Sequence, residues 1–339
     1  MSKRKAPSEE SNPNHDFCEF LTELAEYEKN VTGHIHKYKV YRKAASVLAA
    51  HPTRITSGAE AKKLQGIGDK ISKKIDEFLQ TGKLQKLDNI HHDKESQAIQ
   101  ELTRVSGIGR AKAKKLYEEG ISSIEELKKH TNQLTHHQIV GLKYVNDFEQ
   151  KIPREEIEKI EKVLVKTIKN LDKEYDVTIC GSYRRGKACS GDIDVLITHP
   201  HYKSDRIDKD KKSKTHNHIL KEVVEALENC GLVTETLSLG DSKFMGACQL
   251  SADLPTRRLD IRFQPYDQYY CSILHFTGSD IFNQDMRAFA LEQGFTLNEY
   301  TLRPLGSTGV PGEPVEICSE KDIFDSIGYP YKEPKDREG

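Results

Sequence analysis

The segment Gly181-Ser182-Tyr183-Arg184-Arg185-Gly186, followed by Ser190-Gly191-Asp192-Ile193-Asp194-Val195-Leu196-Ile197, carries the most specific pattern in this chain. Its second half predicts a strand, in which successive side chains point to opposite faces. Asp192 and Asp194 therefore share one face, and the apolar residues pack behind the other. Two carboxylates held side by side repel each other, and oxygen-only ligation suits Mg²⁺ or Mn²⁺. On its own, such a pair also fits solvated acids on an exposed strand.

A second strand pattern, Arg258-Leu259-Asp260-Ile261-Arg262-Phe263, supplies a third carboxylate. The same alternation places Asp260 on the polar face of a neighbouring strand. Three acidic ligands can hold two metal ions about 3.5 to 4 Å apart, one activating a hydroxyl and one clamping a triphosphate. Ser182, Arg185 and the backbone N–H groups of the turn before the first pair are donors for phosphate oxygens. Together these residues predict phosphoryl transfer.

The N-terminal half contains a short repeat, in which Leu64-Gln65-Gly66-Ile67-Gly68 recurs 41 positions later as Val105-Ser106-Gly107-Ile108-Gly109. Each copy joins two predicted helices, and its glycines permit a tight turn whose N–H groups face an anion such as a DNA phosphate. A single copy would more often be a plain turn between helices. The duplication favours DNA binding, as does an excess of 13 Lys/Arg over 4 Asp/Glu between Lys29 and Lys86.

The chain has 339 residues, which is enough for two or three folding units. Apolar residues recur with helical spacing over 16–150 and again over 157–171. Strand patterns follow at 177–180, 192–198, 244–250 and 257–264, with one more helix near 219–227. The fold class is therefore multidomain, all-α first and α+β afterwards. The charged stretch 202–218 is expected to be a surface loop, to which we assign no function.

Several features bear on localisation. No segment approaches the roughly 18 apolar residues of a membrane span, and the start of the chain lacks a secretory pattern. The 7 cysteines, none in a C-x-x-C motif, predict neither a disulfide framework nor a cysteine zinc site. Lys3-Arg4-Lys5 is compatible with nuclear import and equally with a simple disordered tail. We expect a soluble protein of the nucleus, with a cytoplasmic pool.

The spacing from Gly181-Ser182 to Asp192-Ile193-Asp194 resembles the signature of the nucleotidyltransferase superfamily. The two glycine repeats resemble helix-hairpin-helix motifs, and with them the chain is similar to the X family of DNA polymerases over nearly its whole length. Further matching motifs are Arg42-Lys43-Ala44-Ala45-Ser46, Phe276-Thr277-Gly278-Ser279-Asp280 and Asn298-Glu299-Tyr300. The implied domains are a helical lyase domain at 1–89, a helical DNA-binding subdomain at 90–153, a catalytic palm at 154–266 and a dNTP-selecting subdomain at 267–339.

This resemblance implies a template-directed DNA polymerase that fills short gaps in base excision repair. Asp192 and Asp194 would bind both of two Mg²⁺ ions, and Asp260 the one that activates the primer 3′-hydroxyl. The residues implied to contact the incoming nucleotide are Lys151, Ser182, Arg185, Gly191, Phe276, Gly278, Asp280 and Asn283. Those implied to contact DNA in this half are Arg258 and Arg287. Na⁺ or K⁺ would lie at the hairpins, on backbone carbonyls of Lys62, Leu64, Ile67, Thr103, Val105 and Ile108.

The resemblance also implies a 5′-deoxyribose-phosphate lyase, with Lys74 as the nucleophile that forms a Schiff base. Clustered cations favour the neutral amine that such a reaction needs. The residues implied to line this site or to bind DNA near it are His36, Lys37, Tyr41, Lys62, Lys70 and Lys86. The hairpin glycines Gly66, Gly68, Gly107 and Gly109 would contact DNA phosphates.

Four positions depart from the family pattern. Lys151 stands where an arginine is common, which keeps the charge but loses the bidentate fork. Lys73 replaces an acidic residue, so a hydrogen bond to Tyr41 is lost. His275 replaces a tyrosine at the expected primer contact, and Gln284 replaces a lysine.

Two other functions stay open. One is a non-catalytic helix-hairpin-helix scaffold for DNA repair. The other is a template-independent terminal transferase, although such relatives carry an extra N-terminal domain and only about fifteen residues precede the first predicted helix here. The expected partners are gapped or nicked duplex DNA, dNTP and other base excision repair proteins such as a ligase and a scaffold. A monomer without a membrane partner is expected.

Overall fold

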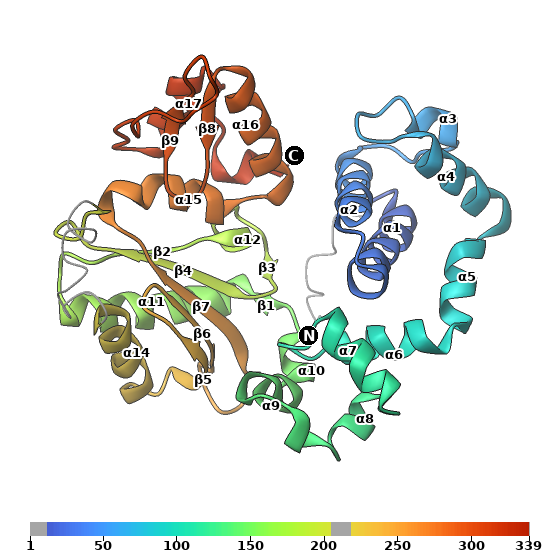
Figure 1. Ribbon diagram of the computed structural model, residues 1–339, viewed down its shortest axis with the longest axis horizontal. Helices are drawn as coiled ribbons and strands as arrows, with labels where there is room; N and C mark the ends of the chain where they lie inside the picture. Colours follow the sequence, from blue (N-terminus) through green and yellow to red (C-terminus); the bar gives the residue numbers. More distant parts are fainter. Residues whose placement is uncertain (1–11, 205–217, 339) are drawn as a thin grey trace, which may run out of the picture. The chain divides into compact units, whose positions relative to one another are not determined.

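The computed structural model describes residues 12–204 and 218–338 (Figure 1). Lys3-Arg4-Lys5 and most of the charged stretch 202–218 therefore lie outside the described residues. The chain forms two compact units, one ending at Leu142 and the other beginning at Lys143. The four finer domains of the sequence analysis stay a prediction.

The first unit is helical throughout its described residues, as its apolar spacing predicts. Its elements are α1 (His15–Tyr27), η1 (Glu28–Thr32), α2 (Ile35–Ala50), α3 (Gly58–Ala61), α4 (Asp69–Thr81), α5 (Gln85–His92), α6 (Lys94–Thr103), α7 (Arg110–Glu118), α8 (Ile124–Leu127), η2 (Thr131–Gln133) and α9 (His136–Lys143). Phe17, Leu21 and Leu24 of α1 pack with Leu48 of α2 and Ile75 of α4 in one buried cluster. This core supports the first glycine turn, which begins α4.

The second unit combines helices with strands, and the predicted α+β class is confirmed. Its helices are α10 (Val145–Phe148), α11 (Arg154–Leu171), α12 (Gly181–Arg184), α14 (Ile219–Asn229), η4 (Tyr266–Gln268), α15 (Tyr269–Thr277), α16 (Asp280–Glu292), α17 (Glu320–Ile327) and η5 (Pro334–Asp336). Its strands are β1 (Ile152–Pro153), β2 (Asp176–Ile179), β3 (Cys189–Ser190), β4 (Ile193–Thr198), β5 (Val233–Leu239), β6 (Lys243–Cys248), β7 (Arg257–Phe263), β8 (Phe295–Leu297) and β9 (Leu302–Pro304).

The main sheet of this unit has five strands in the order β2-β4-β7-β6-β5. The pair β4–β7 is parallel, and the other neighbours are antiparallel. All four predicted strands exist within a residue or two of their predicted bounds, but β5 was not predicted. Its register shifts between Val233 and Glu235 and again between Thr236 and Ser238. These irregularities break the strict alternation by which a strand is recognised.

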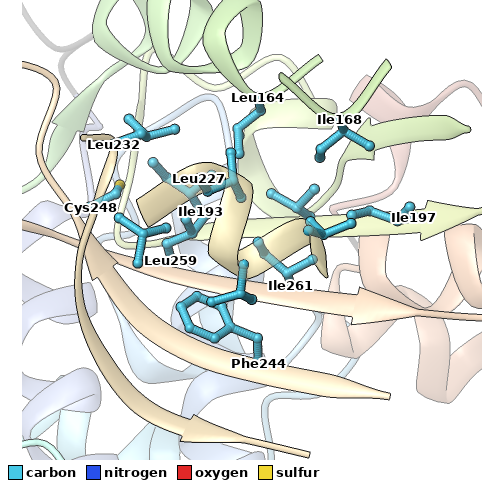
Figure 2. Close-up of a cluster of buried hydrophobic side chains, with 14 of the residues drawn as sticks. Leu164, Ile168, Ile193, Ile197, Leu227, Leu232, Phe244, Cys248, Leu259 and Ile261 are labelled. Atoms are coloured by element: carbon cyan, nitrogen blue, oxygen red, sulfur yellow. The ribbon is translucent and has the colours of Figure 1, made fainter. Parts of the chain in front are cut away.

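One face of the sheet packs against α11 and α14. Figure 2 shows Leu164 and Ile168 of α11 and Leu227 of α14 beside Ile193 and Ile197 of β4. Leu259 and Ile261 of β7 lie in the same buried cluster, with Phe244 and Cys248 of β6. The apolar positions of β4 and β7 thus point as the alternation predicted, which leaves the opposite face for their acidic residues.

The opposite face of β4 changes from polar and accessible to apolar and buried between Asp194 and Leu196. Asp194 is partly accessible, whereas Leu196 is buried with Cys180 and with Tyr269 and Ile273 of α15. Beyond α15, a separate apolar cluster joins Phe282 and Met286 of α16 to other residues of the C-terminal region. Among the described residues, no helix combines the length and the apolar character that crossing a membrane requires.

Candidate active site

The carboxylates gather at the start of the parallel pair β4–β7. The register sets Asp194 directly opposite Asp260, and Ile193 opposite Leu259. Asp192 lies one residue before β4 and is exposed. Neighbouring strands are about 4.8 Å apart, so the side chains of Asp194 and Asp260 leave the same face side by side. The predicted position of Asp260 on an adjacent strand is what the structure shows.

Burial and the closeness of the three acids raise the pKa values of two of these carboxyls. Burial, together with repulsion from Asp192 and Asp260, raises the pKa of Asp194 to about 7. Burial also raises the pKa of Asp260, although the charges of Arg258 and Lys243 act against it. Arg258 Nη2 donates to Asp260 Oδ1, and Lys243 Nζ lies 3.9 Å from Asp260 Oδ2. A divalent cation would relieve the remaining repulsion, and three carboxylates form the oxygen-only donor set that Mg²⁺ or Mn²⁺ favours.

The residues predicted to hold a triphosphate lie beside these acids. The backbone N–H of Cys180 donates to Asp194 O at 2.8 Å, which fixes α12 against β4. Gly181 opens α12 with a φ of 62°, and a Cβ there would lie 3.3 Å from Asp194 Oδ2, so glycine satisfies both the turn and the close approach. Ser182 Oγ donates to Ser190 Oγ at 2.8 Å. The predicted turn is thus a short helix.

Arg185 and Lys151 complete this group. Arg185 Nη1 donates to Thr277 O at 2.7 Å, and its Nε donates to Glu338 Oε1 at 2.8 Å. Lys151 Nζ lies 3.8 Å from the position that a Cβ on Gly191 would take. The structure therefore brings together most of the predicted phosphate donors, and it adds the carboxylate of Glu338, which the sequence analysis did not identify.

The nucleotide-selecting residues lie at the junction of α15 and α16. Phe276 and Gly278 end α15, and Asp280 begins α16 in an exposed position. Asn283 Nδ2 donates to His275 O at 2.7 Å. The guanidinium of Arg262, from β7, lies 4.5 Å from the centre of the Phe276 ring, which connects this junction to the acidic strands.

His275 has a defined role in holding Arg287. Burial and then the positive charge of Arg287 lower the pKa of His275. The neutral ring accepts a hydrogen bond from Arg287 Nη2 at 3.0 Å, while Glu299 lies 3.6 Å from the same nitrogen. The departure from the family pattern at His275 thus coincides with a contact to a residue that is predicted to bind DNA.

A buried ion-pair network that the sequence analysis missed supports the junction. Arg184 donates to Thr277 Oγ1 at 2.8 Å and to Glu320 Oε1 at 3.0 Å. Arg337, which is fully buried, donates to the same Glu320 oxygen at 2.6 Å. No sequence pattern could have revealed this network, because its members are far apart in the chain and charged residues are common throughout.

In the helical unit, Lys74 lies on α4 beside a cluster around Glu28. Burial and then the charge of Lys86 lower the pKa of Lys74. The Glu28 side chain is only 1% exposed and pairs with Lys86 Nζ at 2.6 Å and with Lys37 Nζ at 3.8 Å. Lys86 Nζ also lies 5.8 Å from the centre of the Tyr41 ring. Two predicted residues, Lys37 and Lys86, therefore pair with a buried acid that was not predicted.

The other predicted residues of this unit are placed differently. His36 is exposed on α2, and Lys62 pairs with Asp69 at 2.5 Å. Lys70 is exposed on α4, and its charge contributes to lowering the pKa of Lys74. Lys73 is exposed next to Lys74.

The two glycine repeats fold alike. Gly66 and Gly107 have φ values of 96° and 89°, which only glycine adopts readily. Gly68 and Gly109 are the N-cap residues of α4 and α7. The carbonyls of Leu64 and Val105 accept hydrogen bonds from the second residue of each G-I-G at 3.2 and 3.0 Å. Both turns therefore present a helix N-terminus, as the repeat predicted.

Four family models match successive parts of the chain: a helix-hairpin-helix domain at 12–84, the fingers domain of DNA polymerase lambda at 100–149, the DNA polymerase beta palm at 151–266 and the DNA polymerase beta thumb at 272–338. The chain belongs to the X family of DNA polymerases. The palm and thumb models are named after DNA polymerase beta, and the fingers model is named after DNA polymerase lambda.

Curated relatives match nearly all of the chain. It is 33% identical over 313 residues to DNA polymerase lambda of Arabidopsis thaliana, covering 88% of this chain and 57% of that protein. It is 34% identical over 322 residues to DNA polymerase lambda of Rattus norvegicus, covering 91% and 54%. It is 26% identical over 352 residues to DNA-directed DNA/RNA polymerase mu of Homo sapiens, covering 94% and 67%. The chain spans little more than half the length of the lambda relatives.

Proposed function

We propose that this chain is a template-directed DNA polymerase that fills short gaps during base excision repair and removes the 5′-deoxyribose phosphate through a lysine Schiff base. The observation that carries the polymerase activity is the register of β4 and β7, which sets Asp194 opposite Asp260 with Asp192 one residue outside the strand. Family membership supports the same activity.

In this proposal the three aspartates hold two Mg²⁺ or Mn²⁺ ions. When bound, these ions lower the pKa of the primer 3′-hydroxyl and neutralise the triphosphate and the leaving pyrophosphate. Asp192 and Asp194 would hold both ions, and Asp260 would hold one of them. Arg258, which pairs with Asp260 Oδ1, keeps that carboxylate oriented and lies close to the DNA.

The incoming nucleotide is held by residues of both sides of the site. Ser182, Arg185, Lys151 and the backbone at Gly191 bind phosphate oxygens as hydrogen-bond donors. Phe276 and Gly278 lie under the sugar, and Asp280 and Asn283 contact the base. Arg287, held by His275, faces the minor groove beside the templating base.

In the helical unit, Lys74 is the lyase nucleophile. Its lowered pKa increases the fraction of neutral amine, which adds to the sugar aldehyde; water leaves and a Schiff base forms. Loss of a proton from C2′ then expels the phosphate at C3′. His36, Lys37, Tyr41, Lys62, Lys70 and Lys86 bind the 5′-phosphate or line the site. The hairpins bind DNA phosphates, with Na⁺ or K⁺ on the six backbone carbonyls named above.

The remaining parts of the proposal concern the whole protein. The domains are those predicted from the sequence, at 1–89, 90–153, 154–266 and 267–339. The protein acts in the nucleus, as a monomer, on gapped or nicked DNA, with partners such as a repair ligase and a scaffold.

The experiment uses a duplex with a one-nucleotide gap whose downstream strand keeps its 5′-sugar phosphate. The chain is incubated with Mg²⁺ and each dNTP, and both strands are followed while the templating base is varied. We expect one template-matched insertion and loss of the sugar phosphate. Asp260→Ala should abolish insertion and leave sugar release intact. Lys74→Ala should abolish sugar release and leave insertion intact.

Matched controls are Asp253→Ala and Lys73→Ala, both at exposed positions. Insertion that ignores the template would indicate a terminal transferase. Tight gap binding without insertion would indicate a DNA-binding scaffold. Insertion without sugar release would leave a polymerase that lacks the lyase.

A further inference from the structure

A histidine and carboxylate cluster lies at the far end of β4 from the catalytic aspartates. Among the described residues, Glu174, His199 and His201 are the group of potential metal ligands whose ligand atoms all lie within 4.8 Å of one another. Asp194 and His199 are separated by five residues of strand, or about 16 Å. The cluster is therefore distinct from the proposed active site.

The sheet topology explains why these residues meet. β2 and β4 are antiparallel, and Asp176 at the start of β2 pairs with Thr198 at the end of β4. The residues just before β2 must then lie beside those just after β4. Glu174 comes from the first segment, and His199 and His201 come from the second.

His199 is buried, and its ring is positioned by its neighbours. It is 3% exposed, and the rings of Tyr175 and Tyr202 lie 5.0 and 5.4 Å from its own. Its Nε2 lies 3.2 Å from Asp172 Oδ2. With Nε2–H donated to Asp172, the lone pair of His199 lies on Nδ1. It accepts a long hydrogen bond from the backbone N–H of His201 at 3.3 Å, which a metal ion on Nδ1 would replace. Carboxylates commonly orient metal-binding histidines in this way.

The other two side chains can adjust. His201 Nδ1 lies 4.0 Å from Glu174 Oε2, and the two side chains are 71% and 55% exposed. Zinc bonds of about 2.0 to 2.2 Å require ligand atoms somewhat closer together than they are now. Rotations of two exposed side chains supply that movement without disturbing His199.

We propose that Glu174, His199 and His201 bind one transition-metal ion, of which Zn²⁺ is the best match. Two imidazoles with a carboxylate form a borderline donor set that suits Zn²⁺ and its neighbours, unlike the oxygen-only aspartates, which suit Mg²⁺. Asp172 acts as the orienting carboxylate. The ion links the segment between α11 and β2 to the segment after β4, and so fastens the edge strand β2 to the sheet.

The test is a calorimetric titration of the whole chain with ZnCl₂, without DNA and with millimolar Mg²⁺ present to occupy the aspartates. A parallel titration with CoCl₂ reports the ligand type by absorption. We expect one Zn²⁺ site per chain, a tetrahedral Co²⁺ spectrum without a thiolate charge-transfer band, and binding at least about 10-fold weaker in His201→Ala and in Glu174→Gln.

The matched control is His130→Ala, an exposed histidine of the helical unit. It should keep the site. Zinc at 100 times its dissociation constant should raise the melting temperature of the parent chain by about 5 °C or more, but not that of His201→Ala. The proposal is overturned if no site is found, if His201→Ala folds and binds as tightly as the parent, or if a thiolate band places the metal on cysteine.

Discussion

Asp194 on β4 and Asp260 on β7 are direct register partners in the only parallel pair of the described main sheet. The arrangement forces two carboxylates from distant parts of the chain to share one face, one strand spacing apart. Without a cation the arrangement is unfavourable, as the raised pKa of Asp194 shows. The metal-free protein is therefore expected to be less stable because of the carboxylates that bind the metal.

Replacing Asp194 should therefore stabilise the metal-free protein. In EDTA at pH 8, Asp194→Asn should raise the free energy of unfolding by about 1 kcal/mol, because it removes a buried charge beside two others. The folded pKa of Asp194 lies above the ordinary value of 3.8, so the parent loses stability as pH rises from that value to about 7 and loses no more through this group above it. The gain should therefore shrink at pH 5. Urea unfolding of both proteins at the two pH values measures it, with Asp253→Asn as the exposed control.

The same substitution should cost at least about 100-fold in the rate of gap filling with Mg²⁺. Single-turnover insertion measures this loss. An Asp194→Asn protein that is both less stable in EDTA and fully active would contradict the assignment of the site.

Lys86 should set the pH range in which Lys74 reacts. Lys86→Gln removes a positive charge that lowers the pKa of Lys74, while its amide can still donate to Glu28. The pKa of Lys74 then rises, less of the amine is neutral at pH 7, and the rising limb of the pH profile moves to higher pH. Borohydride trapping of the Schiff base at a series of pH values measures this shift of the profile.

A shift of the profile separates an electrostatic role from a structural one. Lys83→Gln, whose lysine pairs with Asp88 and is 66% exposed, should leave the profile in place. A lower plateau at every pH without a shift would mean that Lys86 only supports the fold or binds DNA.

Glu338 should compete with a triphosphate for Arg185. Its carboxylate accepts from Arg185 Nε at 2.8 Å and lies 3.2 Å from Lys187 Nζ. Glu338→Gln should lower the KM for dNTP by about twofold to fivefold, the range expected for a partly exposed ion pair, and should leave kcat unchanged. Glu333→Gln, at an exposed position, is the control. A higher KM would instead show that Glu338 positions Arg185 for binding.

Among the single ion pairs of the second unit, the buried pair of Glu156 and Arg257 should contribute most to the free energy of unfolding. Two bonds of 2.8 Å join them, and their side chains are 7% and 4% exposed. Glu156→Ala should lower the free energy of unfolding by about 3 to 5 kcal/mol, because Arg257 is left buried and unpaired. Glu158→Ala, which removes a pair that is about half exposed, should cost less than about 1 kcal/mol. Equal losses in urea unfolding would contradict this reasoning.

The sequence predicted what depends on local periodicity. Alternation around Asp194 and Asp260 gave the correct faces of β4 and β7, and the repeated G-I-G gave two alike turns. Residues that act through long-range pairing were missed. Glu28, Glu320 and Glu338 belong to no local motif, and their partners lie far away in the chain. Long-range pairing turns an ordinary glutamate into a site residue, and that pairing is decided by the tertiary fold.

The parallel pairing of β4 with β7 also has a consequence for synthesis. Asp260 leaves the ribosome 66 residues after Asp194, a delay of roughly 3 to 13 seconds at about 5 to 20 residues per second. During that interval β4 can pair with β2 on one side only, and its other edge exposes the apolar strand 193–198. An unpaired apolar edge is a template for aggregation. The feature that completes the carboxylate group therefore also makes the nascent chain dependent on protection until β7 arrives.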